Sequence, residues 1–265
     1  MRVPPRLSLC KYPGGKARLA RWVVRHLPPH ERYVEGFAGA ASVLLNKARA
    51  PSEWLIERDP AQATLLRVAR DRGGELAGRM AEVRFGREAF EESRERLRRG
   101  EWADELDLAG LVYQRRQLSW RGVGLIYDPR GRRDLAAWWA GCVGRLPGVT
   151  ARLRGVQVVE GDALEWLPLL DGPDTLAYCD PPYAWSTRTG FRPYRHELDE
   201  AGHRHLLRVV AGMAGRVVLS GFPNPLYDEA LEGWCREEVT TRSFAYTRGH
   251  RRTRTEVLWM NTCGG

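Results

Sequence analysis

The chain has 265 residues, which suits one large domain, or a domain with an insert, that can bury a substantial core. No segment has the length of a membrane span, and the first residues lack the apolar stretch of a signal peptide, so we expect a cytoplasmic protein without a membrane partner. The formal charge of +9 is typical of a nucleic-acid partner, although a GC-rich genome also enriches arginine.

The cysteines are scattered and never form a C-x-x-C pair. This pattern argues against a disulfide framework and against a zinc site, and the six histidines do not suggest another metal. We therefore expect no bound metal. The cysteines are Cys10, Cys142, Cys179, Cys235 and Cys263.

Near the N-terminus, residues 11–16 read Lys-Tyr-Pro-Gly-Gly-Lys and precede apolar positions that predict an amphipathic helix over residues 17–27. The glycines allow the backbone to approach a ligand closely. The segment is not a Walker A loop, because the spacing before Lys16 is wrong and no Ser or Thr follows it. An ordinary turn with a solvated Lys16 is the alternative.

Residues 33–42 predict a strand that runs into a turn of small residues and then a helix over residues 43–48. Such a junction exposes amide donors that can hold a carboxylate or phosphate. The turn differs from the dinucleotide fingerprint G-x-G-x-x-G, which makes a nicotinamide cofactor a weaker hypothesis.

A second strand, residues 53–56, ends at Glu57-Arg58-Asp59. An acid at the end of the second strand is placed to bind ribose hydroxyls. Asp59 reads as a helix N-cap with Pro60 at the first helical position, so Glu57 is the better ribose candidate.

From about residue 71 to residue 154 the alternation of strands and helices stops. The first half is charged and helical, and the second half is rich in arginine and aromatic residues, including Arg115 and Arg116. The loop Trp120-Arg121-Gly122-Val123-Gly124 suits phosphate contact, base-edge reading or insertion into a duplex. Trp138 and Trp139 are expected in a helical core. We predict that residues 71–154 form a mostly helical insert in a domain of residues 1–70 and 155–265.

After the insert, residues 156–159 predict a strand, followed by Asp162 and a helix over residues 164–170. The carboxylate of Asp162 is placed to accept a hydrogen bond from an adenine amino group of a cofactor. A helix N-cap is the equally plausible interpretation.

The buried strand of residues 176–179 leads directly to Asp180-Pro181-Pro182-Tyr183. Two prolines stiffen this loop and remove two backbone donors, which leaves only acceptors beside an aromatic ring. Such a loop suits a flat group with an amino function, such as an adenine or cytosine edge, with Tyr183 stacked on the ring. A proline-stiffened turn with a capping Asp and a core Tyr is the alternative.

The remaining chain predicts a polar, basic loop over residues 184–197, which contains Arg188 and is a candidate lid. A helix (198–213), a strand (216–220) and a short helix (225–231) follow. Two paired strands, residues 236–244 and 255–261, then enclose a loop over residues 246–254. This loop contains Arg251 and Arg252 and has no acid, so we interpret it as a phosphate clamp.

Four segments in this order resemble the DNA adenine methyltransferase (Dam) family. They are residues 11–16, Val34-Glu35-Gly36-Phe37-Ala38-Gly39, the Asp180-Pro181-Pro182-Tyr183 motif, and Arg254-Thr255-Glu256-Val257-Leu258. The similarity covers about residues 8–70 and 155–262. The Asp180-Pro181-Pro182-Tyr183 motif alone also occurs in RNA and protein methyltransferases, but this order of segments with an insert between the second and third strands is more specific.

The resemblance implies an α/β fold with a Rossmann-like methyltransferase sheet that binds S-adenosyl-L-methionine across its carboxyl edge. It places Tyr12 and Lys16 at the cofactor, Phe37 to Gly39 at the methionine part, Glu57 at the ribose and Asp162 at the adenine, with Asp180 between cofactor and target. The family usually has Asp at the position of Glu57 and Pro at that of Gly36.

The expected reaction is methyl transfer to the N6 amino group of a flipped adenine in double-stranded DNA, as in restriction–modification enzymes of bacterial or phage type. Methylation of RNA adenine or of the cytosine amino group is the alternative, as is an inactive DNA-binding homologue. The insert matches the family least, so the target GATC is not carried over. We expect a monomer, with a weak dimer as the alternative.

Overall fold

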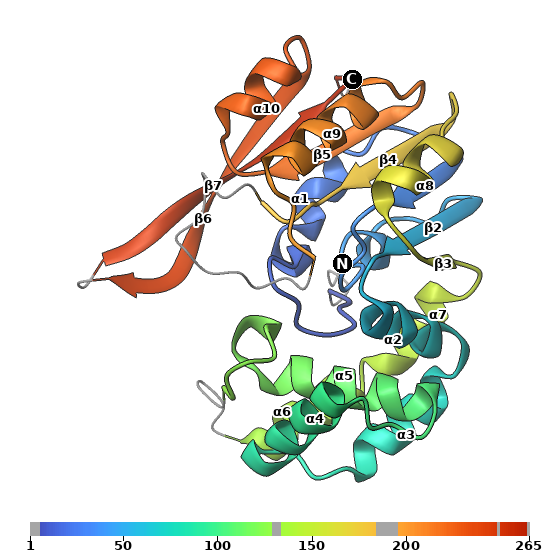
Figure 1. The fold of residues 1–265 in the computed structure, drawn as a ribbon, viewed down its shortest axis with the longest axis vertical. Coiled ribbons are helices and arrows are strands. Elements are labelled where there is room, and N and C mark those ends of the chain that lie inside the picture. Colours follow the sequence, from blue (N-terminus) through green and yellow to red (C-terminus); the bar gives the residue numbers. More distant parts are fainter. Residues whose placement is uncertain (1–5, 129–133, 184–195, 248–249, 264–265) are drawn as a thin grey trace, which may run out of the picture.

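The computed structural model describes residues 6–128, 134–183, 196–247 and 250–263, without the side chains of residues 242–252. Its centre is a seven-stranded sheet of order β3-β2-β1-β4-β5-β7-β6 (Figure 1). The first five strands pair in parallel, and β7 is antiparallel to both of its neighbours. The strands are β1 (Arg32–Glu35), β2 (Ser52–Glu57), β3 (Gln157–Glu160), β4 (Thr175–Cys179), β5 (Arg216–Gly221), β6 (Cys235–Thr247) and β7 (His250–Met260).

This order confirms the predicted Rossmann-like methyltransferase sheet. The chain proceeds outward from β1 to β3, then returns to the centre and proceeds the other way through β4 and β5. The strand order therefore reverses between β1 and β4, and ligands of open α/β sheets bind at such a switch point, beyond the carboxyl ends of the strands.

Helices cover both faces of the sheet, and the central strand β4 is accordingly buried along its whole length. Tyr33 and Leu176 pack into one hydrophobic cluster, whereas Val34 and Ala177, the next residue of each strand, pack into the other. The first face carries α1 (Ala20–Arg25) and α2 (Pro60–Asp71); the second carries α8 (Ala163–Leu169), α9 (Glu200–Ala211) and α10 (Pro225–Ala230).

Two predicted helices are shorter in the structure. The helix expected over residues 17–27 is divided at Leu19 into the 3₁₀ turn η1 (Lys16–Arg18) and α1. The helix expected over residues 43–48 is a single 3₁₀ turn, η2 (Leu44–Asn46). The latter ends because Lys47 is extended and the chain must enter β2 at Ser52.

A helical segment lies between α2 and β3 in the chain and forms the lower part of Figure 1. It contains α3 (Gly73–Glu82), α4 (Arg87–Arg99), α5 (Glu105–Leu118), the turn η3 (Trp120–Gly122), α6 (Leu135–Val143) and α7 (Leu146–Leu153). Side chains of this segment share one hydrophobic cluster with the adjacent face of the sheet. Trp139 is buried there and donates to the Met80 carbonyl at 2.8 Å, so the core prediction for it is confirmed, whereas Trp138 is only half-buried at the edge of the cluster.

The hairpin of β6 and β7 projects beyond the sheet (Figure 1). The predicted loop over residues 246–254 is wrong, because β6 continues to Thr247 and β7 begins at His250. Thr, Phe and Tyr residues are frequent here and favour a ladder, which crosses one irregularity between Arg242 and Tyr246.

The expectation of no disulfide framework needs a correction. Cys235 and Cys263 form a disulfide with a Cα–Cα distance of 5.4 Å. They are 28 residues apart and become neighbours only because the hairpin returns beside its own start, which cysteine spacing does not reveal. The other cysteines, Cys10, Cys142 and Cys179, are free and buried.

Candidate functional site

A pocket lies at the carboxyl ends of the central strands. All the predicted cofactor residues except Lys16 line this pocket, and Lys16 lines an adjoining one that shares Tyr12, Phe37, Gly39 and Asp180 with it. The structure thus brings the predicted cofactor residues together. The first pocket is lined by Tyr12, Gly36, Phe37, Gly39, Glu57, Arg58, Asp59, Gly161, Asp162, Ala163, Asp180, Pro182, His196 and Leu198.

The turn after β1 is held tightly against Tyr12. Gly39 has φ +51°, and a Cβ at this position would lie 2.9 Å from the Tyr12 ring. A side chain is therefore excluded both by the left-handed backbone and by the ring. The Gly39 amide donates to Glu57 Oε2 at 2.8 Å, and the Gln62 amide donates to the Gly39 carbonyl at 2.7 Å. These bonds fix the turn that forms one wall of the pocket.

Glu57 and Asp59 share the end of β2. Glu57 accepts from the amides of Gly39 and Asp59 and is buried, and this burial raises the pKa of its carboxyl to about 7 despite the two bonds. Asp59 accepts from the Ala61 amide at 3.2 Å with Pro60 at the start of α2, so its predicted N-cap role is confirmed. Both carboxyl groups line the pocket.

Asp162 combines a capping bond with a place in the pocket. Its Oδ1 accepts from the Leu164 amide at 2.9 Å at the start of α8, which is the N-cap interpretation. Its Oδ2 lies 3.1 Å from a guanidinium nitrogen of Arg58. The carboxylate nevertheless faces the same pocket as Glu57, across the neighbouring ends of β2 and β3.

Asp180 follows β4 directly and is held by two donors. Lys16 Nζ lies 2.6 Å and Ser220 Oγ 2.8 Å from its Oδ1. Within residues 6–128, 134–183, 196–247 and 250–263, Oδ2 has no hydrogen-bond partner. The side chain is 17% exposed and lines both pockets. The loop thus presents one anchored oxygen and one oxygen available to a ligand.

The Tyr183 ring is surrounded by groups from three other elements. Its hydroxyl donates to Glu256 Oε2 at 2.6 Å, its edge meets Phe222 at 4.4 Å between centroids, and Lys16 Nζ lies 4.8 Å from its centre. Burial, and then the charges of Asp180 and Glu256, raise the pKa of Tyr183 well above its ordinary value. The side chain is therefore a neutral phenol.

Sequence reasoning missed three neighbours of this loop, namely Ser220, Phe222 and Glu256. Glu256 had a recognisable signal, because it is an acid directly before the apolar run Val257-Leu258-Trp259, in a segment expected to be a strand. Ser220 and Phe222 had none, since a serine at the end of a strand and an aromatic residue after it are common.

The arginines of the helical segment that were predicted to bind DNA differ in their exposure to solvent. Arg116 is buried, stacks on the Tyr12 ring at 4.7 Å, donates to the Gly122 carbonyl and lies 3.7 Å from Asp59. Its predicted place at a DNA surface is therefore contradicted: α5 turns this guanidinium toward the pocket. Arg115 is half-buried beside Gly124.

Arg121, by contrast, is exposed and covers the ring of Trp120, with 4.6 Å from its guanidinium carbon to the ring centroid. The loop that carries it packs directly on the N-terminal segment. Lys11 Nζ donates to the Ser119 carbonyl at 3.1 Å, and a Cβ on Gly122 would lie 2.5 Å from the Lys11 backbone. The loop is thereby held beside the pocket.

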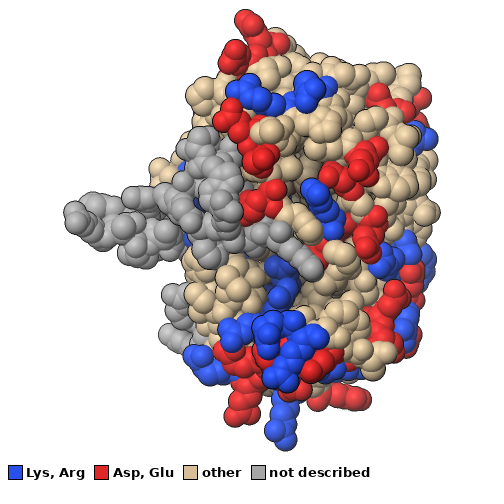
Figure 2. Space-filling model, viewed as in Figure 1, with Lys and Arg blue, Asp and Glu red and all other residues tan. Residues whose placement is uncertain are grey.

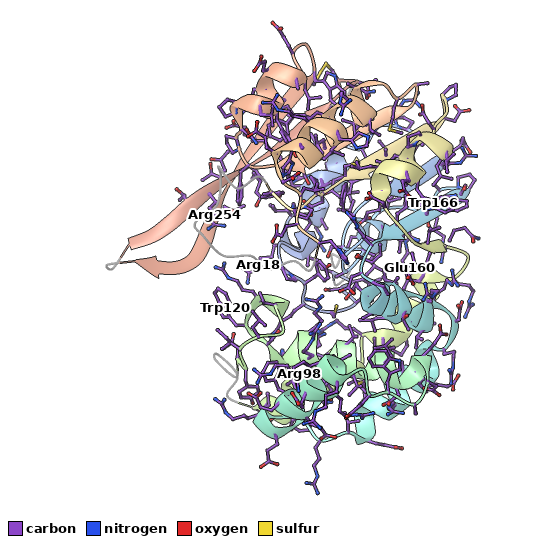
Figure 3. All side chains as sticks on the ribbon, viewed as in Figure 1. Arg18, Arg98, Trp120, Glu160, Trp166 and Arg254 are labelled. Carbon is purple, nitrogen blue, oxygen red and sulfur yellow. A yellow bond between two sulfur atoms is a disulfide. The ribbon has the colours of Figure 1, made fainter. Side chains whose placement is uncertain are left out.

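A broad groove of about 490 Å³ extends from Lys16 between the helical segment and the hairpin. Figure 3 shows Arg18, Trp120 and Arg254 around this opening, each from a different element. Partial desolvation by the surrounding groove and the nearby charge of Arg254 lower the pKa of Arg121, although its side chain is exposed. On the face in Figure 2, Lys and Arg gather most densely over the helical segment. The basic residues that line the groove are Lys11, Lys16, Arg18, Arg121, Arg145 and Arg254.

The remaining predicted DNA contacts cannot be located by side chain. Arg188 and most of the candidate lid fall in residues 184–195, outside the described residues. Arg251 and Arg252 lie on β7, and their side chains are also outside the description. In the part of the chain that is described, no helix has the length and apolarity to cross a membrane, and no three metal-ligating side chains cluster.

Residues 12–57 match the model of the family of D12 class N6 adenine-specific DNA methyltransferases. This match includes Tyr12, Lys16, the turn after β1 and Glu57, and it supports a methyltransferase. No curated protein matches the sequence. The crystal structure of precorrin 8w decarboxylase from Methanobacterium thermoautotrophicum is similar, with a TM-score of 0.40, 15% identity and coverage of 96% of this chain and 94% of that one. At this TM-score the likeness does not bear on function.

Proposed function

We propose that this protein transfers a methyl group from S-adenosyl-L-methionine to the N6 amino group of adenine in double-stranded DNA. The observation that carries the proposal is the position of Asp180. Its carboxylate lines a pocket with the acidic side chains of Glu57 and Asp162, and it accepts a hydrogen bond from Lys16, which lines the basic groove. A cationic cofactor suits the first and a polyanion suits the second.

The pocket residues fit the cofactor. Gly39 lets the turn pack directly on Tyr12 in the pocket wall, and Glu57 and Asp162 would provide acceptors at the ends of β2 and β3 for ribose hydroxyls and an adenine amino group. Lys16 and Tyr12 close the pocket from the N-terminal segment. The bound cofactor supplies an electrophilic methyl group on a sulfonium.

Asp180 would act on the amino group of the target base. The lone pair of this nitrogen is delocalised into the ring, which makes it a poor nucleophile. In this proposal Asp180 Oδ2 and the Pro181 carbonyl accept its two hydrogens, which would favour tetrahedral geometry and direct the lone pair toward the methyl group. Lys16 and Ser220 fix the other carboxylate oxygen and so the orientation of the group.

Access to N6 requires the base to leave the duplex, at a cost of a few kcal/mol. Stacking on Tyr183 and phosphate contacts in the groove would offset that cost. Arg18, Arg121 and Arg254 supply cations from three elements. We assign target recognition to the helical segment, residues 71–154, because its loop carries Arg121 to the rim of the groove.

The deciding experiment incubates the protein with labelled S-adenosyl-L-methionine and either duplex DNA or RNA, digests the product and identifies the labelled nucleoside. We expect labelled N6-methyl-2′-deoxyadenosine from DNA. Label in RNA, or in cytosine, would establish one of the alternative substrates. Confirmed cofactor binding without transfer to any nucleic acid would indicate an inactive DNA-binding homologue.

A further inference from the structure

Glu256 connects the projecting hairpin to the loop that carries Asp180. It lies on β7, and its side chain is 14% exposed. Its Oε2 accepts from the Tyr183 hydroxyl at 2.6 Å and lies 3.9 Å from Lys16 Nζ. A carboxyl group this enclosed is expected to have a specific partner, and here it has two, both beside Asp180.

The Tyr183 ring depends on such side-chain contacts for its orientation. The preceding residues are Pro181 and Pro182, which have no backbone N–H with which to fix the loop to its neighbours. The hydroxyl bond to Glu256 is therefore a main restraint on the plane of the ring, together with the edge contact of Phe222.

Glu256 also shares the charge of Lys16. The ammonium lies between Asp180, at 2.6 Å, and Glu256, at 3.9 Å. Without the second carboxyl group, Lys16 would be free to move toward Asp180 alone. The position of the ammonium between Asp180 and the Tyr183 ring is thus set from both sides.

The same strand reaches into the groove. Arg254 lies two residues before Glu256, so both side chains are on one face of β7, and both line the groove. The Arg254 guanidinium carbon lies 5.3 Å from the Phe222 ring centre, and Phe222 contacts Tyr183. The groove and the Tyr183 ring are therefore joined by side chains of a single strand.

We propose that Glu256 is a positioning residue that fixes Tyr183 and Lys16 around Asp180 and couples them to the groove-lining strand. This inference rests on the proposed function. Glu256 itself lines neither of the two pockets that contain the predicted cofactor residues.

The test compares Glu256→Ala, Glu256→Gln, Tyr183→Phe and the double variant Glu256→Ala/Tyr183→Phe in DNA methylation. Because a ring displaced by about 1 Å can cost on the order of 10²-fold in rate, we expect Glu256→Ala to lower kcat by about that factor. Calorimetry should show cofactor affinity within about threefold of the wild type, since Glu256 lies outside the cofactor pocket. Glu256→Gln keeps an acceptor for the hydroxyl and should recover about tenfold of the loss.

The double variant distinguishes positioning from a general structural role. If Glu256 acts through the Tyr183 hydroxyl, the double variant should be no slower than the slower single variant. Glu238→Ala is the matched control, because this exposed glutamate of the same hairpin pairs with Arg236 on the outside. It should leave kcat and KM unchanged. Thermal unfolding of each variant confirms that it is folded, and Glu256→Gln carries the test if the alanine variant is not.

The outcomes separate the inference from the proposed function. If the wild type methylates DNA adenine and Glu256→Ala does so equally well, only the role of Glu256 is overturned. Multiplicative losses in the double variant would also overturn it, because they mean that Glu256 does not act through Tyr183. If the wild type methylates no DNA adenine, the proposed function fails first and this inference with it.

Discussion

The pocket at the sheet edge and the helical segment use their charged side chains in different ways. In the pocket, each acid stands at or just past the end of a strand, as Glu57, Asp162 and Asp180 do. In the helical segment, Arg116 is buried on Tyr12 while Arg121, five residues later, is exposed at the groove. Strand topology fixes the position of the acids, whereas packing between helices decides what each arginine does.

The largest expected effect is a loss of turnover on substitution of Asp180, at the edge of the sheet. Asp180→Ala removes the acceptor for the target amino group and should lower kcat by about 10²–10³-fold. Cofactor affinity, measured by calorimetry, should change far less. Asp174→Ala is the matched control, since this exposed residue stands at the other end of the same strand. Turnover of Asp180→Ala close to that of the control would remove Asp180 from the mechanism.

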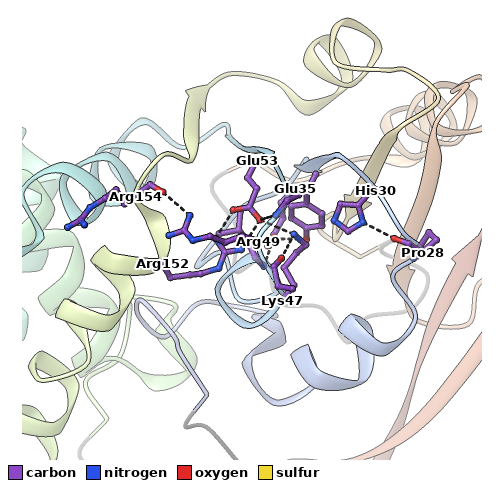
Figure 4. A network of polar contacts seen from close by, with 12 residues as sticks. Pro28, His30, Glu35, Lys47, Arg49, Glu53, Arg152 and Arg154 are labelled. Carbon is purple, nitrogen blue, oxygen red and sulfur yellow. Dashed lines mark hydrogen bonds and ion pairs between the residues drawn. The ribbon is translucent and has the colours of Figure 1, made fainter.

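The next largest effect is a loss of stability where the sheet contacts the helical segment. Glu53 on β2 accepts from Lys47 at 2.8 Å and from both terminal nitrogens of Arg152 on α7, at 2.6 and 2.8 Å (Figure 4). Glu53→Gln leaves two cations poorly compensated in a buried site and should lower the free energy of unfolding by about 3 kcal/mol.

Chemical denaturation measures this change. Glu200→Gln, which breaks the exposed pair with Arg204, is the control and should cost at most about 0.5 kcal/mol. Equal losses in the two variants would show that the junction contributes no more than a surface ion pair.

The buried carboxyl group of Glu35, at the end of β1, should make the free energy of unfolding depend on pH. The pKa of its carboxyl is raised from 4.5 to about 7, mainly by burial and to a smaller extent by the charge of Asp180, while the Leu44 amide, Tyr33 and Lys47 oppose the shift. The folded state thus retains a proton that the unfolded chain has released. The resulting stability is complete below about pH 4.5 and is lost as the pH rises through 7.

Glu35→Gln imitates the protonated form, and its carbonyl oxygen can still accept from Tyr33 and Leu44, which both bond to Oε2. We expect the variant to be more stable than the wild type at pH 8, by roughly 2 kcal/mol, and about equal to it at pH 5. Thermal unfolding at the two pH values measures the difference. A variant less stable at pH 8 would mean that the charged carboxylate is the favoured form.

The next prediction concerns Arg116, which is buried on Tyr12 where the sequence predicted a DNA contact. Arg116→Met keeps the aliphatic stem but removes the cation over Tyr12, which is worth about 2 kcal/mol when desolvated. Because Tyr12 lines the cofactor pocket, the variant should bind the cofactor up to about tenfold more weakly, as measured by calorimetry. A selective loss of DNA affinity instead would restore the surface role predicted from the sequence.

The sequence was sufficient for the sheet and for the residues at its edge. Apolar runs identify the strands. Because parallel strands end at the same edge of the sheet, their order alone brings the acids that follow them together. The places of Glu256 and Phe222 beside Tyr183 were not predicted, because they depend on long-range pairings, of β5 with β4 and of β7 with β5. The disulfide between Cys235 and Cys263 and the burial of Arg116 depend on the same kind of contact, so local patterns could not reveal them.

The smallest effect concerns Arg121 at the rim of the groove. Arg121→Ala should leave the free energy of unfolding within about 0.5 kcal/mol of the wild type, because the side chain is exposed. If this guanidinium contacts a phosphate, DNA affinity should fall by about 1 kcal/mol, and the slope of log K against log salt should decrease by about 1. Arg204→Ala, a variant of an exposed arginine outside the groove, should keep the wild-type slope. An unchanged slope for Arg121→Ala would place the DNA elsewhere and leave the charge of the groove without a role in binding phosphate.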